Sequence, residues 1–379
     1  MSDKHTSYTE SLTDRQGDTM GNRVLIAGAL GICGRNAVRH FADVGGWDIV
    51  GLSRRSPDYE SPARYVSVDL RDPRDCHEKL SELGDFSHIV YTANFEKPSG
   101  VVSAWTEQEH VDTNFAMLRN LLDAALPRSR SLERLILLQG TKAYGSAVGP
   151  IKIPGKEDDP RSLAPNFYYP QEDYVRELQQ GKRWTWTVLR PQFICGHALS
   201  SSLNGLTPVG VYAAISRELN MPLRFPGGEP RVTEATDARL LAKAIRWAAT
   251  TPRCGNEIFN IVNGDCFTWP ALWPKIARLF QMEVGHIAPC SLVTVMADKG
   301  PVWDRIVAKH NLKPYKLEQL VPTWQFTNRL FGYGSRPGYT SISGIKSRKF
   351  GFLEFQDSEE MWLDWLRILQ QDRILPTYS

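Results

Sequence analysis

The chain has 379 residues and a formal net charge of +3, with 42% hydrophobic and 23% charged residues. These values are ordinary for a soluble globular protein and leave enough apolar material for a large core. The small net charge, and the lack of an apolar run of roughly 18 residues, give no support to a nucleic-acid or membrane partner.

The first 21 residues are polar and lack the apolar stretch of a signal peptide, so we expect a disordered tail over residues 1–21. The six scattered cysteines form no Cys-x-x-Cys pair, which favours a reducing, cytoplasmic compartment over a disulfide framework. The eight histidines show no metal-binding spacing, and no metal site is expected.

Short apolar runs alternate with helical patterns through the first half of the chain. The helical spacing is clearest from Asn114 to Ala125. This alternation predicts βαβ units and a parallel sheet, the doubly wound α/β arrangement of a Rossmann fold. We assign residues 22–200 to this nucleotide-binding core. The runs of strand length lie at 23–27, 47–52, 65–70, 88–93, 135–139 and 186–190.

After residue 200 the pattern changes to segments rich in glycine, proline and aromatic residues, separated by helical patterns. The apolar run at 257–262 is typical of a late strand that returns to the sheet. We therefore assign residues 201–379 mostly to a smaller substrate-binding cap that is interleaved with the core. The expected helices of the cap lie at 207–220, 236–250, 269–281, 301–311 and 358–370.

A glycine-rich loop follows the first predicted strand directly. Gly28 would allow the sharp turn, Gly31 the close approach of a pyrophosphate, and Gly34 the close packing of the next helix. The N-terminus of that helix offers free N–H groups to the phosphates. Three spaced glycines also occur in ordinary tight turns, but their position between a buried strand and a helix predicts a nucleotide site.

The end of the second strand indicates which nucleotide binds. Ser53 stands where an NAD site has a carboxylate for the ribose 2′-hydroxyl, whereas Arg54 and Arg55 match a 2′-phosphate. Two loop arginines could also be merely solvated, but the pattern favours NADPH.

Further cofactor contacts are expected at the carboxyl ends of the strands, where ligands bind in such sheets. Asp69 and Leu70 would flank the adenine, and the segment 91–93 would run under the nicotinamide ribose. The full expected cofactor site comprises Gly28, Leu30, Gly31, Ile32, Gly34, Ser53, Arg54, Arg55, Asp69, Leu70, Tyr91, Thr92, Ala93, Asn114, Gln139, Gly140, Lys142, Tyr169, Pro191 and Ile194.

A lysine and two tyrosines are the candidates for the chemistry. The usual reductase signature, Tyr-x-x-x-Lys, is absent, because no tyrosine has a lysine four positions later. Lys142 instead follows the fifth strand, and Tyr168 and Tyr169 begin a predicted helix at 168–180. A phenol beside an ammonium group is a good donor to a developing oxyanion. From these residues alone, a surface lysine and core tyrosines remain open as alternatives.

The segment 166–173 (NFYYPQED), with Gly140-Thr141-Lys142, resembles the progesterone 5β-reductase and iridoid synthase-like family of extended short-chain dehydrogenases/reductases. Residues 222–227 and 349–353 are similar to the family as well, and the resemblance covers nearly all of the chain after residue 20. It implies an extended Rossmann fold, NADPH, and reduction of the C=C bond of enones. It also implies that Tyr169 and Lys142 form the catalytic pair.

The substrate does not follow from the resemblance, because family members act on Δ4-3-oxosteroids, iridoid dialdehydes and small enones. Plant members commonly carry a tryptophan after the fourth strand, whereas this chain reads Asn94-Phe95-Glu96 there, so one pocket wall differs from that of a steroid reductase. We expect an apolar pocket. Its expected walls are Asn94, Phe95, Trp105, Tyr144, Phe193 and Val211.

Other functions remain open on the same fold. One alternative is a carbonyl reductase, an epimerase or a dehydratase, against which the missing Tyr-x-x-x-Lys pair counts. Another is a non-catalytic sensor that binds NADP without turning it over, against which the retention of both Lys142 and Tyr169 counts. A small apolar enone is the expected binding partner, and a homodimer is left open.

Overall fold

The computed structural model describes residues 21–97, 100, 102–229, 231–334 and 340–378. The expected tail therefore lies outside the described residues, except for Gly21. Within the described part of the chain, no helix is long and apolar enough to cross a membrane.

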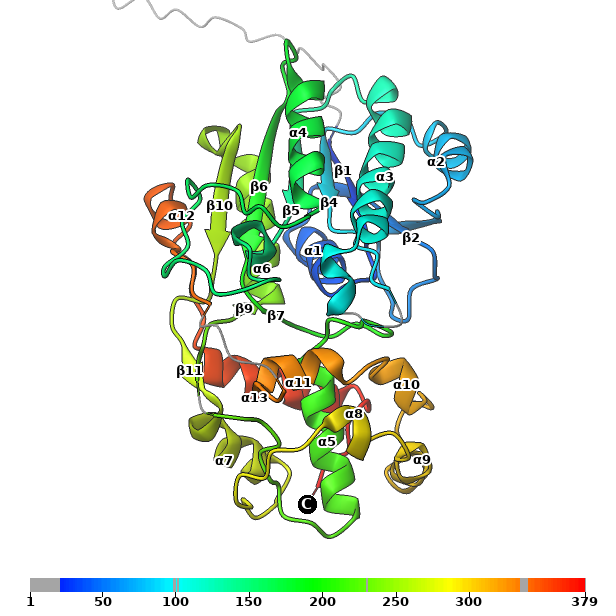
Figure 1. The fold of residues 1–379 in the computed structure, drawn as a ribbon. Coiled ribbons are helices and arrows are strands. Elements are labelled where there is room, and N and C mark those ends of the chain that lie inside the picture. Colours follow the sequence, from blue (N-terminus) through cyan, green and yellow to red (C-terminus); the bar gives the residue numbers. More distant parts are fainter. Residues whose placement is uncertain (1–20, 98–99, 101, 230, 335–339, 379) are drawn as a thin grey trace, which may run out of the picture.

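A seven-stranded parallel sheet organises the larger part of the molecule (Figure 1). The strand order is β10-β6-β5-β4-β1-β2-β3, so the order reverses at β1. All seven predicted strands are present. Parallel sheets bind ligands where the order reverses, beyond the carboxyl ends of the strands. The strands are β1 (Asn22–Ala27), β2 (Trp47–Ser53), β3 (Arg64–Ser67), β4 (His88–Tyr91), β5 (Arg134–Leu138), β6 (Thr185–Pro191) and β10 (Glu257–Ile261).

Strand β1 illustrates why these runs form the centre of the sheet. Leu25 and Ala27 face one apolar core, whereas Val24 and Ile26 face the other. All four are fully buried. A strand that is covered on both faces needs apolar residues at successive positions, which is the pattern that the sequence shows.

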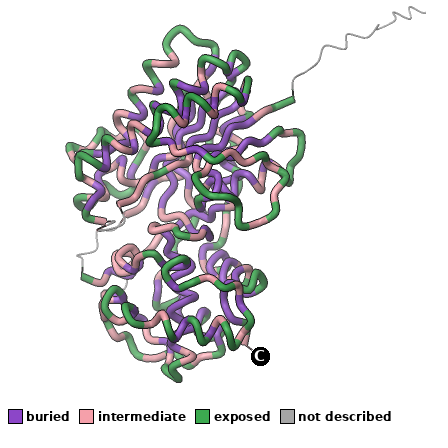
Figure 2. The backbone as a smooth tube through the Cα atoms, turned by 90° about the vertical axis from the view of Figure 1, so that its right-hand side faces the viewer, coloured by how far each residue is buried: buried purple, intermediate pink, exposed green. Residues whose placement is uncertain are grey.

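Helices cover both faces of the sheet. The helices α2 (Pro73–Leu80), α3 (Gln108–Ala125) and α4 (Tyr168–Gln179) pack on one face. On the other face lie α1 (Ile32–Val44) and α6 (Ala238–Thr250), the latter from the C-terminal half of the chain. Figure 2 shows the buried strands between more exposed outer helices.

The apolar periodicity of the sequence did not predict helix α2, although the start of this helix has clear local signals. The Asp72 side chain accepts hydrogen bonds from the backbone N–H groups of Arg74 and Asp75, and Pro73 occupies the first helical position. These are the residue types that begin helices. The helix has only eight residues, too few for a clear apolar period.

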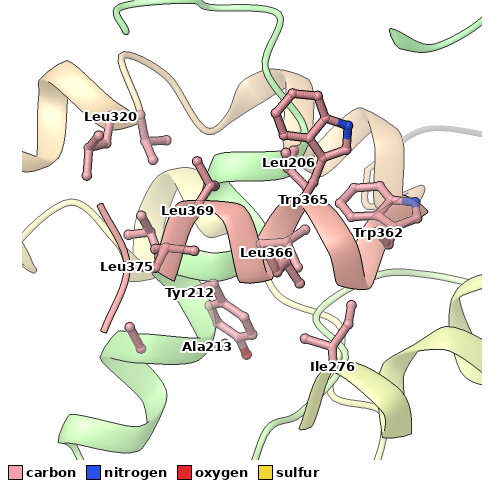
Figure 3. Packing of buried hydrophobic residues seen from close by; sticks show 14 of the residues in the cluster. Leu206, Tyr212, Ala213, Ile276, Leu320, Trp362, Trp365, Leu366, Leu369 and Leu375 are labelled. Carbon is pink, nitrogen blue, oxygen red and sulfur yellow. The ribbon is translucent and has the colours of Figure 1, made fainter. Parts of the chain in front are cut away.

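The second part of the molecule is mainly helical and faces the carboxyl ends of the strands (Figure 1). Its core surrounds α13 (Ser358–Gln371), as Figure 3 shows. Trp362, Leu366 and Leu369 of α13 are fully buried there. The other helices of this core are α5 (Leu206–Glu218), α7 (Trp269–Leu279), α8 (Leu292–Val295), α9 (Gly300–Lys309), α10 (Leu317–Leu320) and α11 (Gln325–Phe331).

Short strand pairs and side-chain contacts connect the two parts. Strand β7 (Ile194–Cys195) pairs with β9 (Thr236–Asp237), and β8 (Val232–Thr233) pairs with β11 (Phe267–Thr268). Asp237 caps α6 and also accepts a hydrogen bond from the indole of Trp365 over 3.1 Å. The side chain at the start of α6 thus fixes α13 relative to the sheet.

Candidate active site

The glycine loop lies where the strand order reverses, between β1 and α1. Gly28 has φ +79°, and a Cβ atom there would lie 2.8 Å from the backbone of Ala93. A Cβ on Gly34 would lie 2.2 Å from the carbonyl oxygen of Gly28. The turn and the close helix packing therefore both require glycine. Gly31 caps α1, whose N-terminus faces the open crevice.

One cavity of about 1040 Å³ extends from this loop towards the helical part of the molecule. Gly28, Gly31 and Ile32 line one end, and Lys142 and Tyr168 line another region. The volume is at the upper end for small-molecule sites and suits a dinucleotide together with a small substrate.

The end of β2 carries positive charge into the same cavity. Ser53, Arg54 and Arg55 all line it, and Arg55 donates a hydrogen bond to the carbonyl oxygen of Leu199 over 3.0 Å. Burial is the main cause that lowers the pKa of Arg55, and the neighbouring Arg54 adds to it. Two adjacent guanidinium groups fit a phosphate at this position. The glycine loop and this arginine pair together fit a phosphorylated dinucleotide.

Lys142 lies in the 3₁₀ turn η3 (Thr141–Tyr144), directly after β5. Its Nζ atom lies 4.5 Å from the centroid of the Trp105 ring and 3.8 Å from Oε1 of Glu96. Within the described residues, this Nζ makes no hydrogen bond. Burial lowers the pKa of Lys142, while the Glu96 carboxylate opposes that shift. The ammonium group is therefore available to a ligand.

The structure places the side chains of the two adjacent tyrosines in different surroundings. Tyr168 lines the cavity. Its hydroxyl lies 3.4 Å from the point that a Cβ atom on Gly140 would occupy. The Lys142 Nζ lies 5.8 Å from the Tyr168 ring centroid. Burial raises the pKa of the Tyr168 phenol, so the group stays protonated and can donate a hydrogen bond.

Tyr169 does not line the cavity. Its hydroxyl donates to the carbonyl oxygen of Ala143 over 2.9 Å and accepts from the backbone N–H of Ser162 over 2.8 Å. Its ring lies 5.1 Å from the guanidinium carbon of Arg161. Because both hydrogen-bonding functions of the hydroxyl are used, the geometry favours Tyr168 over the expected Tyr169 as the donor to a ligand.

A network of buried hydrogen bonds and one ion pair holds the backbone of Tyr168. Gln139 donates to the Tyr168 carbonyl oxygen over 3.2 Å and accepts from Arg190 over 2.8 Å. Arg190 also pairs with Glu172 at 3.2 Å, and both side chains are 5% exposed. Glu172 of the NFYYPQED segment, together with Gln139 and Arg190, thus fixes the start of α4.

Glu96, which follows β4, was not singled out from the sequence as a site residue. Its carboxylate accepts hydrogen bonds from Asn94 over 2.6 Å and from the Trp105 indole over 3.1 Å. Burial raises the pKa of Glu96, and Lys142 opposes this shift. Its place at the carboxyl end of a parallel strand was a signal that could have identified it.

Most of the other expected site residues line the cavity, and a few do not. Tyr91 packs into the core, and Asn114 instead binds both backbone polar groups of Phe95. The Tyr144 hydroxyl binds Asn260, and Val211 is buried inside the helical part, so neither reaches a ligand. The expected residues that line the cavity are Leu30, Asp69, Leu70, Thr92, Ala93, Asn94, Phe95, Trp105, Gln139, Gly140, Pro191, Phe193 and Ile194.

Four further charged residues of the cavity were missed, namely Arg71, Arg231, Glu234 and Arg329. Arg329 comes from the short helix α11, and Glu234 lies between β8 and β9. Burial raises the pKa of Glu234 to about 7, although its carboxylate accepts hydrogen bonds from Ile342 and Ser341. Neither Arg329 nor Glu234 lies in a motif, and only the fold brings them into the cavity.

Comparison with protein families matches residues 77–322 to the PRISE-like Rossmann-fold domain. Similar curated proteins include the (S)-8-oxocitronellyl enol synthase CYC2 of Camptotheca acuminata, which is 35% identical over 377 residues, with 93% of each chain covered. The (S)-8-oxocitronellyl enol synthase ISY1 of Nepeta racemosa is 36% identical, with 93% of this chain and 92% of the relative covered.

Solved structures with a similar fold are more distant in sequence. A UDP-glucose 4-epimerase of Thermus thermophilus, in complex with NAD, has a TM-score of 0.61 at 18% identity, covering 91% of this chain and 99% of its own. The Bordetella bronchiseptica enzyme WbmH, in complex with NAD⁺, has a TM-score of 0.61 at 15% identity, covering 93% and 99%. At these identities the likeness concerns the fold alone.

Proposed function

The chain belongs to the PRISE-like Rossmann-fold family of extended short-chain dehydrogenases/reductases, and from this premise we propose that it reduces the C=C bond of enones with NADPH. The observation that carries the proposal is the meeting of Lys142 and Tyr168 in the cavity that begins at the glycine loop. A hydroxyl donor beside a cation suits a reaction in which negative charge collects on a carbonyl oxygen.

The choice of cofactor rests on the end of β2. Arg54 and Arg55 line the cavity, and Ser53 offers no carboxylate to a ribose 2′-hydroxyl. This supports NADPH over NADH. Bound NADPH would supply a hydride for the β-carbon of the enone.

The residues of the chain would act on the other end of the conjugated system. We place the enone carbonyl within reach of the Tyr168 hydroxyl, which donates a hydrogen bond to the oxygen as enolate charge develops. Lys142 stabilises the same charge through its ammonium group, and Glu96 opposes the loss of the Lys142 proton that burial favours. The α-carbon then takes a proton from solvent. Tyr169 keeps a structural role, because its hydroxyl holds Ser162 and Ala143.

A panel assay tests the proposal directly. NADPH oxidation is followed by absorbance with simple enones, with the corresponding saturated ketones, and without an acceptor. Oxidation with enones and a saturated ketone as product supports the proposal. Oxidation with saturated ketones to alcohols would make the protein a carbonyl reductase, and tight NADPH binding without oxidation would make it a sensor. A cytoplasmic location is part of the proposal and is supported by six free cysteines.

A further inference from the structure

Arg329 places a guanidinium group in the part of the cavity that contains Trp105 and Lys142. Its Nη2 donates to the Ser146 carbonyl oxygen over 2.8 Å, and its Cζ lies 5.3 Å from the centroid of the Trp105 ring. The side chain is half-buried and lines the cavity. Within the described residues no ion pair involves Arg329, and burial is the cause that lowers its pKa.

The charges around Trp105 do not balance. Lys142 lies near the same indole ring, and Arg329 is close enough to lower the pKa of Lys142. Glu96 is the carboxylate that faces Lys142, and both of these side chains are largely buried, at 10% and 13% exposure. Lys142, Arg329 and Glu96 together therefore carry one net positive charge beside this ring. A neutral ligand bound here would desolvate that charge without compensation, which is unfavourable.

Neither the protein nor the cofactor supplies the missing anion in the described residues. The carboxylate of Glu234 accepts from Ile342 and Ser341 and forms no ion pair with Arg329. The cofactor phosphates would bind at the glycine loop and at Arg54 and Arg55, which lie on other elements than Ser146 and Trp105. A negatively charged group of the substrate would supply this charge.

We propose that the natural substrate is an enone that carries a carboxylate, and that Arg329 binds this carboxylate. The inference rests on the proposed enone reduction and names the substrate class of the same site. A guanidinium group pairs with a carboxylate through two parallel hydrogen bonds, which also orients the ligand. With the substrate carboxylate held by Arg329 of α11, the enone oxygen at the other end of the substrate would reach Tyr168.

The test uses a linear methyl-ketone enone with a carboxylate at its far end, and the matching carboxamide of the same length. Saturated carbons separate the end group from the enone, so the two compounds have similar reactivity. We expect kcat/KM of the wild-type enzyme to be about tenfold to a hundredfold higher for the carboxylate, the range of a charge-assisted hydrogen bond. Most of this preference should appear in KM, because the contact lies away from the reacting atoms.

The matched variants are Arg329→Gln, Arg329→Lys and the control Arg183→Gln, which removes an exposed arginine outside the cavity. The ratio of kcat/KM for the carboxylate to kcat/KM for the carboxamide should fall to about one in Arg329→Gln. It should persist in part in Arg329→Lys and stay at the wild-type value in Arg183→Gln. Thermal unfolding and NADPH binding show whether each variant is folded. The wild-type comparison needs no variant and tests the proposal even where Arg329→Gln does not fold.

Reduction of both compounds with equal kcat/KM would overturn the carboxylate assignment and leave enone reduction intact. A preference that survives Arg329→Gln would overturn the role of Arg329. A loss of kcat on the carboxamide that matches the loss on the carboxylate would also overturn it, since Arg329 would then act on the reaction itself. NADPH oxidation with saturated ketones alone would contradict the proposed function and the inference together.

Discussion

Asn166 holds the backbone of Lys142: its side-chain amide donates to the Lys142 carbonyl oxygen over 2.7 Å. The amide oxygen of the same side chain accepts from the backbone N–H of Tyr168 over 3.1 Å. One buried side chain therefore joins the turn after β5 to the start of α4. This contact explains how a lysine and a tyrosine from separate segments keep a fixed geometry.

We expect Asn166→Asp to disturb this geometry with little change in side-chain volume. The aspartate keeps the acceptor for Tyr168 but places a carboxylate against the Lys142 carbonyl oxygen. The lost hydrogen bond should destabilise the fold by about 1 kcal/mol, and kcat should fall about tenfold because Lys142 is displaced. Chemical denaturation and steady-state kinetics measure the two effects. An unchanged kcat would mean that Asn166 does not position the lysine.

Tyr168→Phe should lower kcat for enone reduction by about 10²–10³, the cost of losing one oxyanion donor. The matched control is Tyr169→Phe at the next position, whose hydroxyl binds Ser162 and Ala143 outside the cavity. That variant should lose stability, by about 1 kcal/mol, and keep kcat within a few-fold. The opposite ranking of the two kcat values would return the catalytic role to Tyr169.

The two tyrosines also mark the limit of what the sequence could predict. Parallel strands such as β1 were predictable because burial on both faces leaves a continuous apolar run, and the position of Lys142 followed from the end of β5. Neighbouring residues on a helix point about 100° apart. The face of α4 that meets the cavity depends on its packing, so the string Tyr168-Tyr169 could not say which ring enters the site.

The charged lining was less predictable, for a physical reason. Arg329 belongs to a seven-residue helix, which is too short to show an apolar period. Its contact with Ser146 joins segments 183 positions apart, which no local pattern records. Tertiary packing alone brings such residues into the cavity.

The cofactor preference should depend on Arg54 and Arg55. Replacing both with serine should weaken NADPH binding about tenfold to a hundredfold, because a phosphate loses its charged partners. NADH binding should change less than threefold, since NADH lacks the 2′-phosphate. Fluorescence titration with both nucleotides gives the ratio, and Arg183→Ser controls for a general change in charge. Equal losses for the two nucleotides would count against a 2′-phosphate contact.

Gly34→Ala should impair the nucleotide site through packing alone. The added Cβ would lie 2.2 Å from the Gly28 carbonyl oxygen, so α1 must move away from the loop. We expect a loss of about 1–3 kcal/mol in stability and weaker NADPH binding. Gly300→Ala is the control, because a Cβ there meets nothing within 4 Å. Wild-type melting and binding in Gly34→Ala would show that the loop tolerates the shift.

Glu96→Gln should change the pH dependence of the reaction in a defined direction. Burial lowers the pKa of Lys142, and the Glu96 carboxylate raises it again, while Arg329 lowers it further. Removing the carboxylate therefore lowers the pKa of Lys142, so the ammonium group loses its proton at a lower pH. The basic limb of the kcat profile should move to lower pH, with the largest loss of rate on the alkaline side. Glutamine can keep the hydrogen bond from the Trp105 indole, so packing is largely preserved. An unmoved basic limb would mean that the charge of Lys142 does not limit the reaction, and that Glu96 serves only to hold Asn94 and Trp105 in place.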